Sequence, residues 1–377
     1  MKIKDLLLRE NFQSIFETTL ESFLLSHTGR KHTVKWYDKK VKELQSDQLW
    51  FCNPLINSIF VKKFNPDIFS SINGEYSYNP TRPFKSLFQK FYLKISQSHI
   101  FGLPLAKSNI TISPPLENAE YKLIIGGNNK IRILDINERK VFVILKSGFN
   151  KEYLMKDRLV KEKFPYISTP KIIDHGIDDQ WFSEEYVLGK PPNRFKDPLG
   201  NIILKEAINN MNMLLLDTRE EMDLVEYKEN LINKIKNCIN QLHYIDQPTK
   251  IEMNQIIDRL SLLLRDSVEK KIALAYCHGD FHQGNILSDG KNFWIVDWEH
   301  SGKKQIAYDL LIYLLDTRNE EGFSKRFSVI YDSKLNAFQK DIIKNWPGLN
   351  WDNKVQRNIY LYLFLLEDLL FYLKENM

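Results

Sequence analysis

The sequence has few cysteines: Cys52, Cys238 and Cys277 are the only three in 377 residues. Their number is odd and they lie far apart in the chain. A small secreted protein held together by disulfides needs a denser and even set of cysteines, so this class is excluded. We therefore expect a reducing compartment and free thiols.

Long apolar runs are also lacking. The three leucines at positions 6–8 are followed at once by charged residues, and this run is too short for the apolar part of a signal peptide. The most apolar late stretch, residues 359–373, is interrupted by Glu367 and Asp368, which predicts a packed helix rather than a membrane span. We expect a cytoplasmic protein with no membrane span.

Charge of one sign is not in large excess. The net charge is +5, and lysines alternate with acidic residues instead of clustering. This pattern supports neither nucleic-acid binding nor a polybasic membrane patch. An apolar content of 43% and a charged content of 27% are ordinary for a globular protein, and the length allows two or three domains.

The most informative stretch is Tyr-Cys-His-Gly-Asp-Phe-His-Gln-Gly-Asn-Ile-Leu at 276–287, followed by Phe-Trp-Ile-Val-Asp-Trp-Glu at 293–299. An Asp-Gly pair between the two predicts a tight hairpin. The hairpin is expected to bring Asp280, Asn285 and Asp297 towards one end of a small sheet. A carboxylate to orient a hydroxyl, with an amide and a second carboxylate for a hard cation, is what metal-assisted phosphoryl transfer requires.

These residues resemble the aminoglycoside phosphotransferase/choline kinase family, relatives of the protein kinases, in the pattern His-Gly-Asp-x-x-x-x-Asn followed by Ile-Val-Asp-Trp-Glu. The resemblance implies that Asp280 is the catalytic base and that Asn285 and Asp297 bind magnesium. It also implies that His278 braces the loop and that Asp309 is a structural residue.

Two other interpretations of the motif remain. A hairpin of an unrelated α+β protein could use these residues as turn formers. A zinc site could use Cys277, His278, His282 and His300. No Glu follows His278, however, and the neighbouring glycines disfavour the helix that a zinc-protease motif needs.

Three strands are expected at 121–125, 130–134 and 141–145, with Gly126 and Gly127 in the first turn. Alone, this is an ordinary hairpin turn. The resemblance implies that the two glycines face the phosphates of ATP and that Lys146 binds them. It also implies an acidic partner for Lys146 on the helix expected at 150–164, either Glu152 or, as the alternative, Glu162.

Residues 184–189 (Glu-Glu-Tyr-Val-Leu-Gly) resemble the segment that connects the two lobes in this family. The resemblance implies that backbone groups of Glu185 and Val187 bind the adenine edge of ATP. Glu184 stands where the family more often has an apolar residue.

The resulting fold prediction is an α+β, two-lobed protein-kinase-like chain, with a five-stranded antiparallel lobe and a mainly helical lobe. We expect an N-terminal extension of unknown role at 1–110, a nucleotide-binding lobe at 111–189 and a helical catalytic and acceptor-binding lobe at 190–377. Within the extension, periodicity predicts a helix over 5–25 and leaves 84–96 open between helix and strand.

The predicted function is transfer of the γ-phosphoryl group of ATP, with Mg²⁺, to a hydroxyl of a small molecule: a sugar, polyol, aminoglycoside or amino alcohol. Glu299, Glu367 and Asp368 are candidate carboxylates for a polycationic acceptor, whereas the basic balance favours a neutral or anionic one. A catalytically silent nucleotide-binding module is the alternative. A protein kinase is disfavoured, because Asp309 follows Asp297 by only 12 positions and no Ala-Pro-Glu signature is present. The oligomeric state is not indicated.

Overall fold

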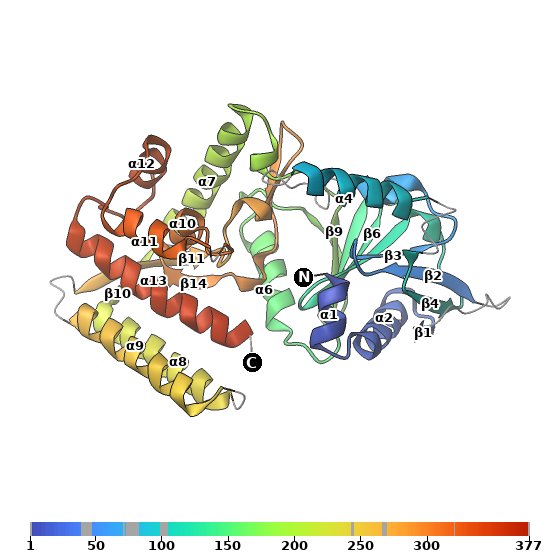
Figure 1. The fold of residues 1–377 in the computed structure, drawn as a ribbon, viewed down its shortest axis with the longest axis horizontal. Coiled ribbons are helices and arrows are strands. Elements are labelled where there is room, and N and C mark those ends of the chain that lie inside the picture. Colours follow the sequence, from blue (N-terminus) through green and yellow to red (C-terminus); the bar gives the residue numbers. More distant parts are fainter. Residues whose placement is uncertain are drawn as a thin grey trace. The chain divides into compact units, whose positions relative to one another are not determined.

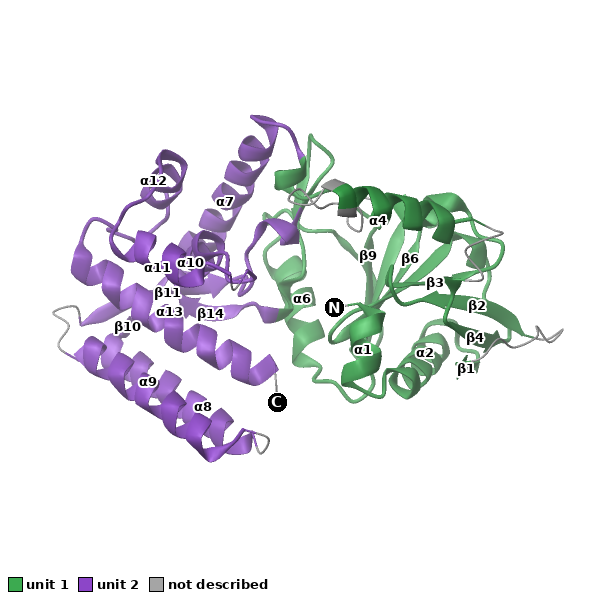
Figure 2. Cartoon of the chain, viewed as in Figure 1, with its two compact units in different colours: residues 1–194, 287–299 green, residues 195–286, 300–377 purple. Residues whose placement is uncertain are grey.

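The computed structural model describes residues 2–38, 47–70, 72, 83–98, 105–242, 245–265, 270–319 and 321–375. The chain divides into two compact units (Figure 2). Unit 1 comprises Met1–Arg194 and Leu287–Glu299, and unit 2 comprises Phe195–Ile286 and His300–Met377. The candidate motif at 276–299 therefore contributes residues to both units.

Unit 1 is built on an antiparallel sheet of nine strands. Their order across the sheet is β1 (Thr33–Tyr37), β4 (Ser108–Ser113), β2 (Gln48–Asn53), β3 (Ser58–Val61), β5 (Lys122–Gly126), β6 (Lys130–Asp135), β7 (Lys140–Leu145), β9 (Trp181–Glu185) and β8 (Ile172–His175). A separate two-stranded sheet, β12 (Ile286–Ser288) and β13 (Phe293–Ile295), confirms the hairpin predicted around the Asp-Gly pair.

The first four strands belong to the same sheet as the predicted nucleotide-binding strands, which is why the sheet has nine strands and not five. The predicted boundary between residues 110 and 111 falls inside β4. Asn57, in the turn after β2, fastens the two parts together. Its side chain accepts the backbone N–H of Ile3 and donates to the carbonyl of Gly126, each at 2.9 Å.

Helices cover both faces of this sheet. In Figure 1, α1 (Ile3–Arg9) and α2 (Phe12–Thr28) lie below it and α4 (Pro83–Ser96) above it. The helix predicted over 5–25 is thus interrupted, because Glu10 has an extended backbone. The α2 face is aromatic: the ring of Phe142 on β7 lies 5.3 Å from Phe23 and 4.8 Å from His27.

The strand register determines which side chains share a face. Directly paired residues of antiparallel strands point the same way, and successive residues alternate. Phe142 pairs with Ile133 and contacts α2, so the other face carries Lys130, Arg132 and Glu184. We call this the α6 face, because it lies against α6 (Glu152–Lys163) through the ion pair of Lys130 with Asp157.

Unit 2 is mainly helical, with a three-stranded sheet ordered β10 (Glu220–Asp223), β11 (Lys271–Cys277), β14 (Gly302–Gln305). Its helices are α7 (Leu199–Asp217), α8 (Leu224–Gln241), α9 (Gln247–Arg265), α10 (Tyr308–Leu315), α11 (Phe323–Tyr331), α12 (Ala337–Lys344) and α13 (Lys354–Glu375). Apolar residues of α8, α9 and α13 form one core. The predicted α+β class, with an antiparallel-sheet part and a mainly helical part, is confirmed.

Hydropathy gives no spanning segment: within the described ranges, every helix is too short or too polar to cross a bilayer.

Glu367 is a buried acid in the core of unit 2, only 3% exposed. One carboxylate oxygen accepts the Tyr227 hydroxyl at 2.5 Å and the backbone N–H of Gln305 at 3.1 Å. Burial raises the pKa of Glu367 to about 7, although Lys304 opposes the shift. Its contacts show that Glu367 holds α13 to α8 and β14, so it is placed as a structural residue rather than as a carboxylate for a cationic acceptor.

The raised pKa predicts a pH-dependent stability. Between pH 4.5 and 7 the folded chain keeps a proton on Glu367, whereas the unfolded chain, with the ordinary pKa of 4.5, has released it. The contribution of Glu367 to the free energy of unfolding therefore decreases as the pH rises from about 4.5 to 7. Glu367→Gln keeps an accepting oxygen for both hydrogen bonds and has no charge to bury. At pH 8 the variant should be more stable by about 3 kcal/mol, and at pH 4 the two should be equal. Urea unfolding at both pH values measures this, and a constant difference would contradict it.

Candidate functional site

The loop that carries Asp280 is held by a buried carboxylate beneath it. Asp309, at the start of α10, accepts the backbone N–H groups of His278 at 2.6 Å and Gly279 at 2.9 Å. The His278 ring then accepts the N–H of Asp280 at 3.2 Å. The predicted structural roles of His278 and Asp309 are confirmed by these bonds.

Gly279 is required in this loop. Its backbone φ is +85°, a conformation that residues with a Cβ rarely adopt. A Cβ built there would lie 2.0 Å from the carbonyl oxygen of His300. The loop after β11 can therefore pass close to the 300–302 backbone only with glycine at this position.

Asp280 is 7% exposed and is surrounded by donors. Asn285 donates to its backbone carbonyl at 2.9 Å and to its carboxylate at 3.2 Å. Arg318, which the sequence analysis missed, binds both carboxylate oxygens, with its Nε at 2.8 Å from Oδ1. Burial raises the pKa of Asp280, but hydrogen bonds from His282 and Arg318 outweigh it and bring the pKa down to about 2. Asp280 is thus ionised at neutral pH.

Asp297 lies in unit 1, two residues beyond the end of β13, with φ at +70° in the left-handed region. Such a conformation is uncommon for a residue other than glycine and is concentrated at functional sites. Its Oδ1 accepts from Lys130 Nζ and from Arg132 Nη2, each at 3.0 Å. Both donors come from the α6 face of the sheet.

Lys130 is 2% exposed and is bound by three carboxylates. Besides Asp297, its Nζ lies 3.0 Å from Asp157 on α6 and 3.1 Å from Glu299. Burial lowers the pKa of Lys130, but the three carboxylates outweigh it and raise the pKa above its ordinary value. We call Lys130, Asp157, Asp297 and Glu299 the Lys130 cluster. Burial raises the pKa of Glu299 to about 7 against the effect of Lys130.

The predicted pairing of Lys146 with Glu152 is wrong. Lys146 is buried on the α2 face of the sheet and pairs with Glu10, between α1 and α2. Glu152 pairs with Lys156 on the surface, and the alternative, Glu162, pairs with Arg158. The reason is the alternation of side chains along a strand. Lys146 points to the α2 face, as Phe142 and Ile144 do. The carboxylate that α6 offers to the sheet is Asp157, and it meets Lys130 on the opposite face.

The predicted glycine turn is packed under α1. A Cβ on Gly126 would meet Ile3 at 2.9 Å and Leu6 at 3.0 Å, and Gly127 is also buried. The turn is followed at once by Lys130, the first residue of β6.

The connecting segment begins where β9 ends. The backbone N–H of Glu185 donates to the carbonyl of Lys171 at 2.9 Å, so this donor is already used. Within the described ranges, no hydrogen bond of Val187 is found.

The structure therefore unites the predicted residues only in part. Asp280 and Asn285 lie together in unit 2, and Asp297 lies in unit 1 with Lys130, Arg132 and Asp157, which the sequence analysis did not select. A signal for Lys130 existed: it is the first residue of β6, directly after the glycine turn, and Arg132 follows it on the same face of the strand.

Asn285 and Asp297 each carry an oxygen of the kind that magnesium binds. The hydrogen bonds of Asn285 to Asp280 use its amide nitrogen, which leaves the amide oxygen for a cation, and Asp297 offers a carboxylate that is about one-third exposed. In the ranges that the structure describes, no three His, Cys, Asp or Glu side chains converge as metal ligands. The predicted magnesium ligands, Asn285 and Asp297, are one amide and one carboxylate, so they would not form such a group of three.

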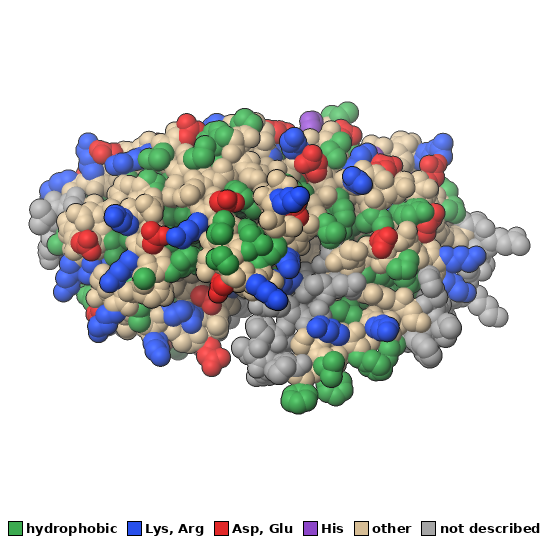
Figure 3. Space-filling model, turned by 90° about the horizontal axis from the view of Figure 1, so that it is seen from above, with side chains coloured by type: hydrophobic (Ala, Val, Ile, Leu, Met, Phe, Trp, Pro, Cys, Tyr) green, Lys and Arg blue, Asp and Glu red, His purple; other side chains and the backbone are tan. Residues whose placement is uncertain are grey.

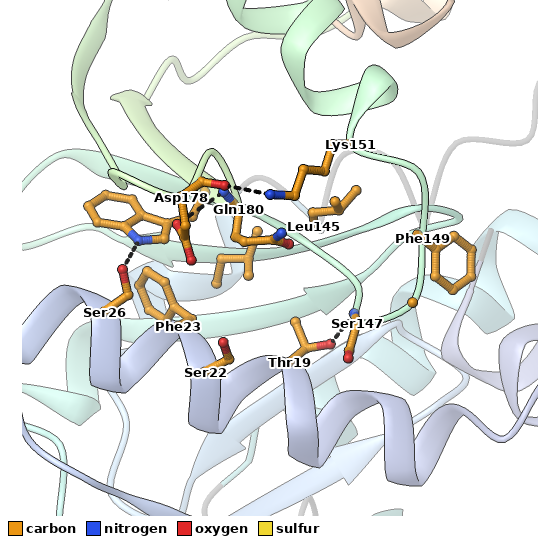
Figure 4. A pocket seen from close by; sticks show the side chains of 13 residues that line it. Thr19, Ser22, Phe23, Ser26, Leu145, Ser147, Phe149, Lys151, Asp178 and Gln180 are labelled. Atoms are coloured by element: carbon orange, nitrogen blue, oxygen red, sulfur yellow. Dashed lines mark hydrogen bonds between the residues drawn. The ribbon is translucent and has the colours of Figure 1, made fainter.

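A cavity of about 300 Å³ lies on the α2 face of the sheet (Figure 4). Thr19, Ser22 and Ser26 line it from α2, and Gln180 and Trp181 line it from the start of β9. Lys151 Nζ reaches the Asp178 carbonyl at 2.9 Å across its rim. None of the predicted site residues lines this cavity, so it is distinct from the candidate site.

Several solved structures resemble the chain at low sequence identity. A choline kinase from Cryptosporidium parvum Iowa II has 16% identity and a TM-score of 0.42, over 68% of this chain and 84% of that one. An ethanolamine kinase from Plasmodium vivax has 16% identity and a TM-score of 0.43, over 81% and 87%. An aminoglycoside phosphotransferase from Streptomyces rimosus, in complex with ADP and streptomycin, has 13% identity and a TM-score of 0.39, over 63% and 94%.

Among curated proteins, none matches the chain. Residues 203–336, which include Asp280, Asn285 and Asp297, match the family model described as choline/ethanolamine kinase. This match confirms the resemblance to the aminoglycoside phosphotransferase/choline kinase family that the sequence motifs indicated.

Proposed function

We propose that the chain is an ATP- and Mg²⁺-dependent phosphotransferase that moves the γ-phosphoryl group to a hydroxyl of a small molecule. The observation that carries the proposal is the Lys130 cluster: a buried lysine held by a helix carboxylate next to the Asp of the Ile-Val-Asp-Trp-Glu motif. Kinases use such a lysine, held by a helix carboxylate, to bind the phosphates of ATP.

In this proposal each residue has a separate task. Asp280 orients the acceptor hydroxyl and accepts its proton as the new bond to phosphorus forms and the bond to ADP breaks. Asn285 and Asp297 hold magnesium, which neutralises charge on the phosphates. Lys130, in place of Lys146, binds the phosphates, and Asp157, in place of Glu152, holds Lys130. The backbone of Val187 binds the adenine edge. Gly126 and Gly127 form the turn that positions Lys130 at the start of β6. Glu185 is the last residue of β9 and leads into the segment that contains Val187.

Arg318 acts together with His282 to keep Asp280 ionised in this reaction. A guanidinium that binds both oxygens of a carboxylate is a strong, geometrically specific pair. It keeps Asp280 ionised, and the acceptor hydroxyl must share the carboxylate with Arg318 or displace it.

The first test is ADP release from ATP and Mg²⁺ with a panel of hydroxyl compounds: aminoglycosides, choline, ethanolamine, free sugars and polyols. We expect turnover with one class, and a loss of at least about a hundredfold in Asp280→Asn, which keeps the size of the side chain. ATP-induced thermal stabilisation should persist in the variant. Stabilisation by ATP without turnover on any acceptor would instead favour a catalytically silent nucleotide-binding module, and labelled phosphate on protein would favour a protein kinase.

The two lysines provide a matched pair of variants. Lys130→Met should weaken ATP binding about tenfold or more, because it removes a charged donor to the phosphates. Lys146→Met should leave ATP binding within about twofold, because Lys146 lies on the other face of the sheet. After Lys130→Met, Asp157 keeps Lys161 and Asp297 keeps Arg132, but Glu299 loses its lysine, so the melting temperature should fall and ATP is titrated well below it. ATP titration by calorimetry measures both, and the reverse ranking would restore Lys146 as the phosphate lysine.

The magnesium assignment is tested with Asp297→Ala. We expect loss of Mg²⁺-dependent turnover with the fold retained, since Lys130 keeps Asp157 and Glu299 as partners. Circular dichroism checks the fold, and turnover is measured across a Mg²⁺ titration. Activity equal to that of the unchanged chain at every Mg²⁺ concentration would refute the assignment.

A further inference from the structure

Helix α4 of unit 1 exposes a row of large apolar side chains. Phe84, Leu87, Phe88 and Phe91 are 79%, 65%, 72% and 64% exposed. Their spacing of three, four and seven residues places them on one face of the helix. We call these four residues the α4 stripe. Single exposed apolar residues are ordinary, but a contiguous patch of three phenylalanines and a leucine marks an interaction surface.

The opposite face of α4 packs onto the sheet, which fixes the direction of the stripe. Leu93 is 4% exposed and Ser96 is fully buried. Asn53 at the end of β2 donates to the Ser96 hydroxyl and accepts the Tyr92 hydroxyl, both at 3.3 Å. The stripe therefore points away from the sheet. In Figure 3, which looks from above, apolar side chains project beside Lys or Arg side chains over α4.

The charged residues of α4 itself are all positive. The fourteen residues of α4 include three lysines and no Asp or Glu. Lys90 and Lys94 are exposed and lie three residues after Leu87 and Phe91, so they flank the stripe on one side. Among the residues with a described placement, neither lysine forms an ion pair.

The apolar stripe and the lysines beside it together indicate which kind of partner binds there. A second copy of the chain would bring its own lysines against Lys90 and Lys94, which like-charge repulsion disfavours. An anionic bilayer offers lipid phosphates to the lysines and an apolar layer directly beneath them. Aromatic side chains are favoured at that boundary, and lysines extend along it to keep the charge in water.

We propose that α4 docks the chain onto an anionic membrane surface. The helix lies parallel to the bilayer, with Phe84, Leu87, Phe88 and Phe91 inserted below the headgroups and Lys90 and Lys94 at the lipid phosphates. At 1.5 Å per residue its fourteen residues extend only about 21 Å, too short to cross the hydrocarbon core. The proposal concerns the surface of unit 1 and does not depend on the phosphotransferase activity.

The test is flotation of the full chain with lipid vesicles. We expect binding to vesicles of phosphatidylcholine mixed with phosphatidylserine, weaker binding to phosphatidylcholine alone, and weakening by salt. Phe88→Ser combined with Phe91→Ser should lower partitioning by about a hundredfold, since each buried Phe contributes roughly tenfold. Lys90→Glu should lower binding to the anionic vesicles about fivefold or more and change binding to neutral vesicles little.

The matched control changes two exposed leucines on a different helix. Leu262→Ser combined with Leu263→Ser, on α9, removes a similar number of apolar side chains that are 60% and 52% exposed. It should bind the vesicles as the unchanged chain does. Melting temperatures should be similar in all variants because every changed residue is at the surface.

Three outcomes would overturn the proposal: no vesicle binding, equal loss in the α9 control, or unchanged binding in the Phe88/Phe91 variant. Sedimentation of the lipid-free chain identifies the competing occupant. A dimer that Phe88→Ser with Phe91→Ser dissociates, together with absence of vesicle binding, would assign the stripe to a second copy of the chain.

Discussion

The buried charge of Lys130 is the constraint on which the arrangement of unit 1 depends. An ammonium group that is almost fully removed from water is stable only if carboxylates surround it, because a buried unpaired charge costs several kcal/mol. Lys130 meets this requirement with Asp157 from α6 and with Asp297 and Glu299 from the segment after β13. Three parts of the chain that are distant in sequence are therefore held at one face of the sheet. The same requirement fixes where Asp297 can lie.

In unit 2 a buried acidic side chain is stabilised by backbone N–H groups. Asp309 is fully buried, and its two oxygens accept the N–H groups of His278 and Gly279. A carboxylate that accepts two backbone donors fixes the course of the loop that carries them. The loop can then present Asp280 in one orientation while Asn285 and Arg318 hold the side chain. Preorganisation of this kind is what phosphoryl transfer requires from a protein, because positioning supplies most of the catalysis.

The sequence could predict what depends on short spacing and could not predict what depends on distant packing. The hairpin at 286–295, the loop of His278 and Asp280, and the strands around the glycine turn all follow from neighbouring residues. The choice between Lys130 and Lys146 does not. Both residues lie at strand ends, and only the helices covering each face distinguish them: α1 and α2, with Glu10, cover one face, and α6, with Asp157, meets the other. The union of β1–β4 with β5–β9 likewise rests on the pairing of β3 with β5 and on the hydrogen bond of Asn57 to Gly126, 69 positions away.

For the proposed reaction, the low pKa of Asp280 constrains the kind of help that this residue can give. A carboxylate with a pKa of about 2 is a weak base, so it removes little of a hydroxyl proton before the bond to phosphorus forms. Its effect is then mainly to orient the hydroxyl and to offer negative charge as the proton is released. This suits a loose transition state, in which the nucleophile needs little activation and the charge lies chiefly on the transferred group. The pair with Arg318 agrees with this role, because it keeps Asp280 ionised and fixed in position. It also makes Asp280 a weaker base, but the reaction does not require a strong one.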